Sequence, residues 1–272
     1  MAGSGERALI VTGGGTGIGR AVALHMAACG WRVAVNYSKS RDEAEATAEE
    51  CRRAGGGGFA VAGSVAVDGD CRRIVAETVS RWGRLDGLVN NAGVTEFRPP
   101  DDLAALTAED FARIFSVNVT GAYQMSRAAA DALRAAAAER SSPADGPGPG
   151  IVNISSHGAF TGLGSSMAYA ASKGALNTLT LALARSLAPT IRVNAVCPGF
   201  VDTDWVRRTM TDTAYEGFRA RVASISPLGR ISRPEDVAEA VAWFLTCGGT
   251  VTGQLLVVDA GVHLTIRTPL AG

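Results

Sequence analysis

The chain has 272 residues, 47% of them hydrophobic, and its 26 basic and 26 acidic residues give a formal net charge of zero. This balance disfavours a nucleic acid as a partner, because a polyanion is bound through an excess of basic residues. The chain contains no run of roughly 20 apolar residues that would cross a membrane, and residues 1–7 do not read as a signal peptide.

The cysteines support the same expectation about the compartment. Five cysteines are scattered along the chain without a CxxC pair, which is typical of reduced thiols in a cytoplasmic protein. None of the three histidines clusters with a cysteine, so we expect no metal site.

Short β-branched runs alternate with longer helical patterns along the chain. In chain order, the predicted elements are a strand at 8–11, a helix at 18–29, a strand at 32–36, a helix at 41–54, a strand at 59–62, a helix at 68–82, a strand at 87–90, a long helical region at 107–138, a strand at 151–154, a helix at 167–187, a strand at 191–196, a helix at 234–245 and a strand at 255–258. Strands that are apolar almost throughout predict a parallel sheet covered by helices on both faces. We therefore predict an α/β, doubly wound (Rossmann) fold in a single domain that spans 1–272.

One segment interrupts this alternation. Residues 139–150 are rich in proline, glycine and serine, a composition that ends a helix and predicts a flexible surface insertion. We do not interpret it as a domain boundary, because the next strand leads to residues of the same predicted site.

The first strand runs directly into the sequence TGGGTGIG, which spans residues 12–19. Glycines at 13, 17 and 19 suit a tight turn, the close approach of a pyrophosphate and close packing of the helix on the strand. The helix that begins near Ile18 directs its positive dipole end at a phosphate. The loop therefore predicts a dinucleotide site.

A second pattern carries chemistry. Tyr169 and Lys173 are one helical turn apart and share a helix face, and Ser156 lies thirteen residues before the tyrosine. A nearby cation favours phenolate, so we expect Lys173 to lower the phenol pKa from its usual value of about 10. The pattern predicts proton transfer to or from a carbonyl or alcohol oxygen. Ser155 is chemically equivalent to Ser156, and only the spacing favours the latter.

His157 follows the serine and raises the hypothesis of a Ser–His hydrolase. We disfavour it, because side chains of adjacent strand or turn residues usually point apart, and the chain has no G-x-S-x-G motif.

The glycine loop and the Ser–Tyr–Lys pattern occur together with further motifs. These are Asn90-Asn91-Ala92-Gly93, then Asn118, and Pro198-Gly199 followed by Thr203. In order and spacing the motifs resemble the classical short-chain dehydrogenase/reductase family, from Ala8 to about His263. The resemblance implies a Rossmann-fold oxidoreductase that transfers a hydride between a nicotinamide cofactor and a small-molecule carbonyl or alcohol.

The resemblance also implies roles for individual residues. Tyr169 is expected to be the general acid/base, with Lys173 lowering its pKa and holding the nicotinamide ribose. Ser156 is expected to bind the substrate oxygen, and Asn118 to interrupt its helix and hold a water that links Lys173 to solvent. Asn90 and Gly93 are expected on the adenosine side, and Thr203 at the carboxamide. The full set of implied cofactor contacts is Gly13, Thr16, Gly17, Ile18, Gly19, Tyr37, Ser38, Lys39, Ser64, Val65, Asn91, Ala92, Gly93, Tyr169, Lys173, Pro198, Gly199, Val201 and Thr203.

The end of the second strand favours NADP(H), with NAD(H) as the alternative. No acid is present there to bind a ribose 2′-hydroxyl, whereas Ser38, Lys39 and Arg41 suit a 2′-phosphate. In the opposite direction, Thr16 stands where many NADPH enzymes of the family carry a basic residue. Ser64 stands where the family commonly has an aspartate for the adenine amine.

The C-terminal motifs PGFVDTD (198–204) and PLGR (227–230) resemble those of 3-oxoacyl-carrier-protein reductases, and many sugar and alcohol dehydrogenases share them. The basic residues expected for docking an acyl carrier protein are missing from the ends of the relevant helices. A substrate lid is expected at 204–226. Apolar residues expected to form a pocket wall, or alternatively to pack helices or an oligomer contact, are Phe97, Phe160, Leu163, Trp205, Val206 and Met210.

Other hypotheses remain beside the reductase. One is a sugar, polyol or other secondary-alcohol dehydrogenase of the same family. The others are a catalytically inactive nucleotide-binding regulator and a sugar-nucleotide epimerase. The resemblance further implies a homotetramer packed through the helices at 107–138 and 167–187.

Overall fold

The structure is a computed structural model and describes residues 7–99, 101–140 and 146–265. Residues 1–6, on which the signal-peptide prediction rests, lie outside this part. So do residues 141–145 of the predicted insertion, whose described ends are 139–140 and 146–150.

In the described residues, seven parallel strands form one sheet in the order β3-β2-β1-β4-β5-β6-β7. The strands are β1 (Ala8–Val11), β2 (Arg32–Tyr37), β3 (Gly58–Ala62), β4 (Gly87–Asn90), β5 (Gly150–Ile154), β6 (Arg192–Pro198) and β7 (Leu255–Val258). The predicted doubly wound fold is confirmed, and the strand bounds agree with the prediction to within two residues.

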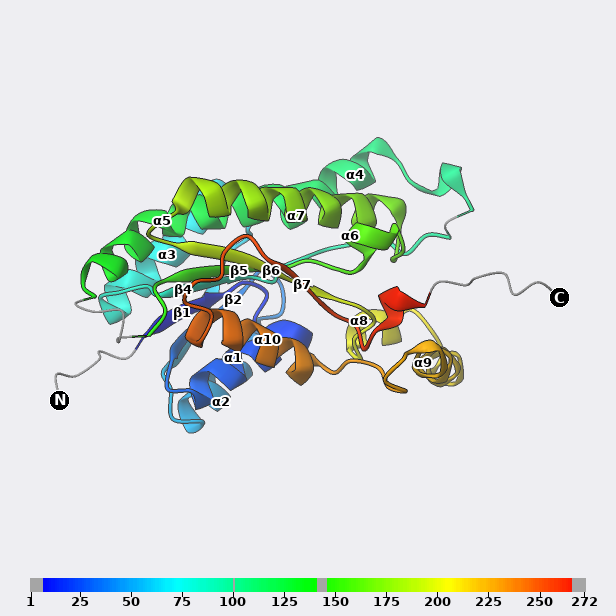
Figure 1. The fold of residues 1–272 in the computed structure, drawn as a ribbon, viewed down its shortest axis with the longest axis horizontal. Coiled ribbons are helices and arrows are strands. Elements are labelled where there is room, and N and C mark those ends of the chain that lie inside the picture. The colour runs from blue at the N-terminus through cyan, green and yellow to red at the C-terminus, as the bar shows by residue number, and fades with distance from the viewer. Residues whose placement is uncertain (1–6, 100, 141–145, 266–272) are drawn as a thin grey trace.

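Helices cover both faces of the sheet, with α1, α2 and α10 on one face and α3, α5 and α7 on the other (Figure 1). The helices are α1 (Gly17–Ala28), α2 (Arg41–Arg53), α3 (Asp68–Trp82), α4 (Ala108–Phe115), α5 (Ala122–Ala138), α6 (Gly158–Thr161), α7 (Met167–Leu187), α8 (Asp204–Arg207), α9 (Asp212–Ile225) and α10 (Pro234–Thr246), with 3-10 turns at Leu103–Ala105 and Val262–Leu264. None of the helices within the described residues is both long and apolar enough to cross a bilayer.

The alternation of side chains along each strand divides the core into two layers. Leu9 and Val11 of β1 pack in one cluster with α1 and α10, whereas Ile10 packs in the other with α3 and α5. Because successive strand residues point to opposite faces, an apolar strand is required wherever both faces are covered.

The helical region predicted at 107–138 is divided in the structure. The helices α4 and α5 are joined by a π-helical segment, Ser116–Gly121, and a capping box between Thr107 and Asp110 begins α4. The extra residue of a π turn changes the direction of the side chains it carries, and such turns occur often at functional sites.

The strand order reverses between β1 and β4, so the helices that follow these two strands lie on opposite faces of the sheet. In a doubly wound sheet a ligand site forms at this reversal, beyond the carboxyl ends of the strands. Helices α6, α8 and α9 lie beyond one end of the sheet (Figure 1), and α6 and α8 follow the carboxyl ends of β5 and β6.

Candidate active site

The glycine loop after β1 is bound directly to the segment after β4. The Thr12 hydroxyl accepts hydrogen bonds from the backbone N–H groups of Asn91 and Ala92, both at 3.0 Å. The Asn91 amide donates to the carbonyl oxygens of Thr12 and Gly13 at 2.9 and 3.0 Å. Two loops that are about 80 residues apart in the sequence are thereby fixed as one surface.

Glycine is required at several positions of this loop. Gly13 and Gly17 have φ values of +60° and +52°, in the left-handed region that other residues rarely adopt. A Cβ atom at Gly19 would lie 2.3 Å from the Gly13 carbonyl oxygen and 2.5 Å from the Asn91 amide nitrogen. A Cβ atom at Gly17 would lie 3.5 Å from the Thr203 methyl group, so the loop faces Thr203 closely.

The amino end of α1 suits a phosphate. Thr16 is the N-cap residue, is exposed and makes no side-chain capping bond, and Ile18 is half-buried in the first turn. Uncapped backbone N–H groups and the helix dipole are the groups that bind a phosphate. The residues present therefore fit the dinucleotide predicted from the sequence.

The end of β2 presents the residues predicted to select the cofactor. Tyr37 is half-buried, and Ser38 and Lys39 are exposed. Arg41, by contrast, pairs with Glu45 one turn further along α2, with a 2.7 Å contact. Arg41 therefore shares its charge with a carboxylate. Lys39, the other predicted cation, forms no ion pair with any of the described residues.

The segment after β3 lies beyond the same carboxyl end of the sheet. The backbone N–H of Ser64 donates to Asp70 at 2.9 Å, and the carbonyl oxygen of Val65 accepts from Gln124 at 2.9 Å. These bonds fix the backbone at the position where the adenine is expected.

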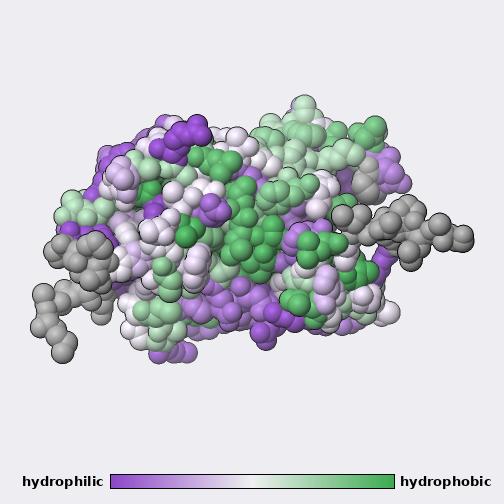
Figure 2. Space-filling view, viewed as in Figure 1, coloured by the Kyte–Doolittle hydropathy of each residue, from purple (hydrophilic) through white to green (hydrophobic). Residues whose placement is uncertain are grey.

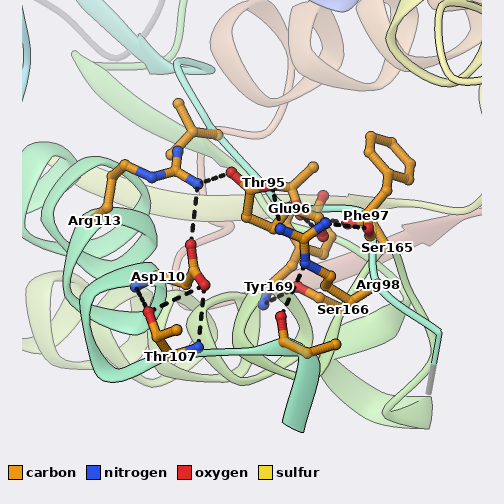
Figure 3. A network of polar contacts seen from close by, with 12 residues as sticks. Thr95, Glu96, Phe97, Arg98, Thr107, Asp110, Arg113, Ser165, Ser166 and Tyr169 are labelled. Carbon is orange, nitrogen blue, oxygen red and sulfur yellow. Dashed lines mark hydrogen bonds and ion pairs between the residues drawn. The ribbon is translucent and has the colours of Figure 1, made fainter. Parts of the chain in front are cut away.

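Ser156 and Tyr169 lie together beyond the carboxyl end of β5. Ser166 caps α7 by accepting a hydrogen bond from the Tyr169 backbone N–H at 3.2 Å, which places the tyrosine in the first turn (Figure 3). The Ser156 oxygen accepts a hydrogen bond from the Gly158 N–H at 3.1 Å, and its side chain lies close enough to the Tyr169 phenol to lower the phenol pKa. Ser155 instead donates to the Lys173 carbonyl oxygen at 3.2 Å and is 3% exposed. The structure therefore distinguishes the two serines.

Lys173 is buried between the tyrosine and the sheet. Its ammonium donates to the Ile154 carbonyl oxygen at 2.7 Å and lies 5.6 Å from the centre of the Tyr169 ring. Burial lowers the pKa of Lys173 to about 8, because an ammonium loses its hydration there.

The expected effect of Lys173 on the tyrosine is not found in the structure. Burial raises the pKa of Tyr169 to about 12, and the neighbouring Ser156 hydroxyl acts in the opposite direction but has the weaker effect. The sequence-based expectation of a lowered phenol pKa is therefore wrong for the protein as described. The physical reason is that the ammonium is directed at the Ile154 carbonyl rather than at the phenol oxygen.

This result gives a pH prediction. A raised pKa means that the phenolate of Tyr169 appears only above the ordinary tyrosine value of about 10. We expect the ultraviolet phenolate titrations of the wild type and of Tyr169→Phe, measured without ligands, to coincide from neutral pH to about pH 10. A phenolate that titrates near neutral pH in the wild type alone would contradict the assignment.

Asn118 joins three segments around Lys173. It lies in the π-helical segment, is 1% exposed, and its side chain accepts from the Val94 N–H at 2.8 Å and donates to the Val94 carbonyl at 3.0 Å. It also donates to the Ser172 hydroxyl at 3.0 Å. A Cβ atom at Gly93 would lie 3.4 Å from the Asn118 oxygen and 3.9 Å from the Lys173 nitrogen. The structure thus brings Asn118, Gly93 and Lys173 together.

The loop after β4 borders the tyrosine as well. The hydroxyls of Thr95 and Ser165 lie 2.6 Å apart, and the Arg98 backbone N–H donates to the Ser165 carbonyl at 2.9 Å. In Figure 3 the same loop reaches α4 through an ion pair between Glu96 and Arg113. The start of α7 is therefore held against this loop.

The segment after β6 contacts the turn after β7 and faces the glycine loop. Gly199 donates its N–H to the Val258 carbonyl at 3.0 Å, and a Cβ atom there would lie 2.5 Å from the Cβ of Asp259. Val201, 7% exposed, forms a β-bridge with Ser232, and Thr203 follows it opposite Gly17.

Two groups of residues at the site were missed or misplaced by the sequence. Thr12 organises both loops, and only its position at the strand end gives a signal for it. Asn90 was expected on the adenosine side, but its side chain is directed into the interior. It is 5% exposed and donates to Asn153 and Ser126 at 2.9 and 3.1 Å. The contact of His157 with Asp259 has no sequence signal, because 102 residues separate the two.

The apolar residues predicted to line a pocket differ in exposure. Phe160 and Leu163 after β5, and Trp205 and Met210 after β6, are exposed by 38% to 64%, whereas Phe97 and Val206 are half-buried. The four exposed side chains do not pack in the described core.

Comparisons with known proteins agree with the geometry. A family model described as Enoyl-(Acyl carrier protein) reductase matches residues 13–263. A Streptomyces violaceoruber protein assigned as ketoacyl reductase 2 of the granaticin polyketide synthase is 40% identical over 255 residues, covering 94% of this chain and 95% of the relative.

Two solved structures are similar over nearly the whole chain. One, from Burkholderia xenovorans, is assigned as a short-chain dehydrogenase/reductase; it has 41% identity and a TM-score of 0.86, and the match covers 96% of this chain and 100% of that one. The other is an NADH-dependent reductase, A1-R′, responsible for alginate metabolism; it has 29% identity and a TM-score of 0.80, with 95% and 97% coverage.

Proposed function

The chain belongs to the short-chain dehydrogenase/reductase family of oxidoreductases, and on that premise we propose that it reduces a carbonyl to an alcohol, or oxidises the alcohol, with a nicotinamide cofactor. The observation that carries the proposal is the convergence of Ser156, Tyr169, Lys173 and Asn118 at one end of the sheet, beside a glycine loop that suits a dinucleotide.

Each residue has a defined task in this proposal. The nicotinamide, when bound, supplies or accepts the hydride. Ser156 accepts a hydrogen bond from the Gly158 N–H, which positions its oxygen, and its own O–H can be donated to the substrate oxygen. Tyr169, a phenol at neutral pH, donates the proton to that oxygen in reduction. Such a positioned acid contributes about 10²–10⁴ to the rate.

Lys173 and Asn118 complete the proton path. With its pKa lowered to about 8 by burial, Lys173 can lose and regain a proton near neutral pH. Asn118 fixes the backbone of Val94 and the hydroxyl of Ser172. We propose that these two residues resupply the proton that Tyr169 gives up.

We propose NADP(H) as the preferred cofactor, with NAD(H) as the alternative suggested by the NADH-dependent structural neighbour. The residues that would hold it lie in the glycine loop, in the segments after β2, β3, β4 and β6, and, as Tyr169 and Lys173, on α7. Exposed Ser38 and Lys39 support a 2′-phosphate.

Lys39→Ala tests this preference. We expect the dissociation constant of NADPH to rise about 10-fold, as for the loss of one charged hydrogen bond, and that of NADH to change little. Arg41→Ala is the matched control with a smaller effect, because Arg41 pairs with Glu45. An equal change for both cofactors on Lys39→Ala would exclude a 2′-phosphate contact.

For the substrate we propose a 3-oxoacyl thioester, with a sugar, polyol or other secondary alcohol as the alternative. The name of the Streptomyces relative supports the thioester, and the exposed apolar side chains of Phe160, Leu163 and Trp205 suit an acyl chain. Docking of an acyl carrier protein is not part of the proposal, because the last turn of α5 has no basic residue and that of α7 has Arg185 alone.

The test is NADPH and NADH oxidation, measured side by side with a short 3-oxoacyl thioester, diketones and keto sugars. Reduction of the thioester with NADPH is the expected result. Turnover of another carbonyl alone would move the protein to the sugar or alcohol branch. Absence of turnover on the whole panel would count against the proposal.

The lid and the assembly are proposals too. We propose that 204–226 covers the substrate and that its mobile part is α8, since α9 is anchored by Tyr215, which donates to Asp202 at 2.5 Å.

We also propose a homotetramer. Figure 2 shows an apolar area over the middle of the visible face. Separately, β7 is an edge strand of the sheet and its Leu256 is 40% exposed.

A further inference from the structure

The turn after β7 contains a buried carboxylate that binds groups from both sides of the site. Asp259 is 4% exposed and accepts hydrogen bonds from the backbone N–H groups of Gly261 and His263 at 2.9 and 2.8 Å. The Nδ1 atoms of His263 and His157 lie 2.8 and 3.3 Å from its two oxygens. Bonds to the charged form keep its pKa below the usual range, although burial alone would raise it.

The ionised carboxylate determines how the two imidazole rings are oriented. A carboxylate only accepts hydrogen bonds, so both rings must carry their proton on Nδ1. His157 directly follows Ser156, and its own backbone N–H donates to the Pro198 carbonyl at 2.8 Å. The ring and the backbone of His157 are therefore both fixed.

The same turn also contacts the end of the predicted lid and the loop after β6. Ala260 has a φ of +55°, a strained value for a residue with a side chain, and its carbonyl accepts from the Ser226 hydroxyl at 2.8 Å. Ser226 is the last residue of the predicted lid. The Cβ of Asp259 packs so closely on Gly199 that a Cβ atom at Gly199 would clash with it. The turn therefore also contacts the loop after β6.

We propose that Asp259 is a positioning residue of the reaction: through His157 it holds Ser156 in place to bind the substrate oxygen. The inference rests on the proposed function and adds to it a residue that does not touch the substrate. Its contact is with the residue next to Ser156, so loss of the contact lowers turnover while the cofactor loop stays formed.

Asp259→Asn is the first test. Asparagine keeps the Cβ and the shape, so packing on Gly199 is retained, but its amide nitrogen cannot accept a hydrogen bond. We expect kcat for carbonyl reduction to fall about 10-fold, as for the loss of one charge-assisted bond, with the dissociation constant of NADPH little changed. Asp86→Asn is the matched control: Asp86 is a buried, bonded aspartate before β4, at the opposite end of the sheet.

A double-mutant cycle with His157→Ala separates positioning from a general loss of stability. Because Asp259 acts through His157, Asp259→Asn is expected to lower kcat little further in the His157→Ala background. His157→Gln, which keeps a side-chain N–H donor, is expected to recover part of the loss seen in His157→Ala.

These outcomes are decisive in both directions. Full kcat in Asp259→Asn, a fall of equal size in Asp86→Asn, or additive losses in the cycle would overturn the positioning role. If Asp259→Asn does not fold, the comparison of His157→Gln with His157→Ala decides, and equal losses refute the proposal. A wild type that binds NADPH but reduces no carbonyl would instead refute the proposed function, which is a different result.

Discussion

Replacing Tyr169 by phenylalanine is expected to lower carbonyl reduction by about 10³-fold, within the 10²–10⁴ that a positioned acid contributes. The phenol lies beside Ser156, the residue expected to bind the substrate oxygen, and is therefore placed to donate the proton. Phenylalanine keeps the ring beside Lys173 and removes the hydroxyl alone. The dissociation constant of NADPH, measured by fluorescence, is therefore expected to stay close to that of the wild type.

Tyr123→Phe is the matched control for this variant. Tyr123 lies on α5, is 43% exposed and stacks with Arg127 rather than with any residue of the site. Its turnover is expected to equal that of the wild type. Near-normal turnover of Tyr169→Phe would show that another group supplies the proton, and the assignment of the site would fail.

Replacing Gly19 by alanine is expected to weaken cofactor binding about 10- to 100-fold. The added Cβ would lie 2.3 Å from the Gly13 carbonyl oxygen and 2.5 Å from the Asn91 amide, and neither group can move without opening the bonded surface of the two loops. Overpacking of this kind costs about 1–3 kcal/mol. Titration calorimetry with NADPH measures the loss.

Gly69→Ala provides the comparison for that variant. Gly69 lies in the first turn of α3, and a Cβ there would meet nothing within 4 Å. Alanine favours a helix over glycine, so binding is expected to be unchanged and stability to rise slightly. Wild-type affinity in Gly19→Ala would mean that the glycine loop does not hold the cofactor.

The sheet and its major helices could be predicted because each element is long enough to show a characteristic pattern of apolar residues. The apolar strand at 8–11 and the helix at 68–82 appear with the predicted bounds. The short helix α6, with four residues, shows no period, and the π turn at Asn118 depends on packing rather than on local sequence. The apolar pattern therefore shows neither of them. The family resemblance does imply that Asn118 interrupts its helix, and the π-helical segment confirms that expectation.

The site was predictable where residues are close in the sequence or belong to a motif. The spacing alone selected Ser156 over Ser155, and the structure places only Ser156 against Tyr169. Electrostatics were not predictable. The pKa of Tyr169 depends on burial and on the direction of the Lys173 ammonium, and neither can be read from a spacing of four residues. The bond of His157 to Asp259 likewise exists only once the sheet has formed.

The central claim is a net transfer of reducing equivalents from the cofactor to a carbonyl, and its stoichiometry tests it most directly. NADPH consumed and hydroxy product formed would be measured together, with a 3-oxoacyl thioester as substrate. We predict one NADPH consumed for each hydroxy thioester formed. Product formed without net consumption of NADPH would indicate an epimerase, and tight NADPH binding without consumption on any carbonyl would indicate a regulator; either would contradict the account.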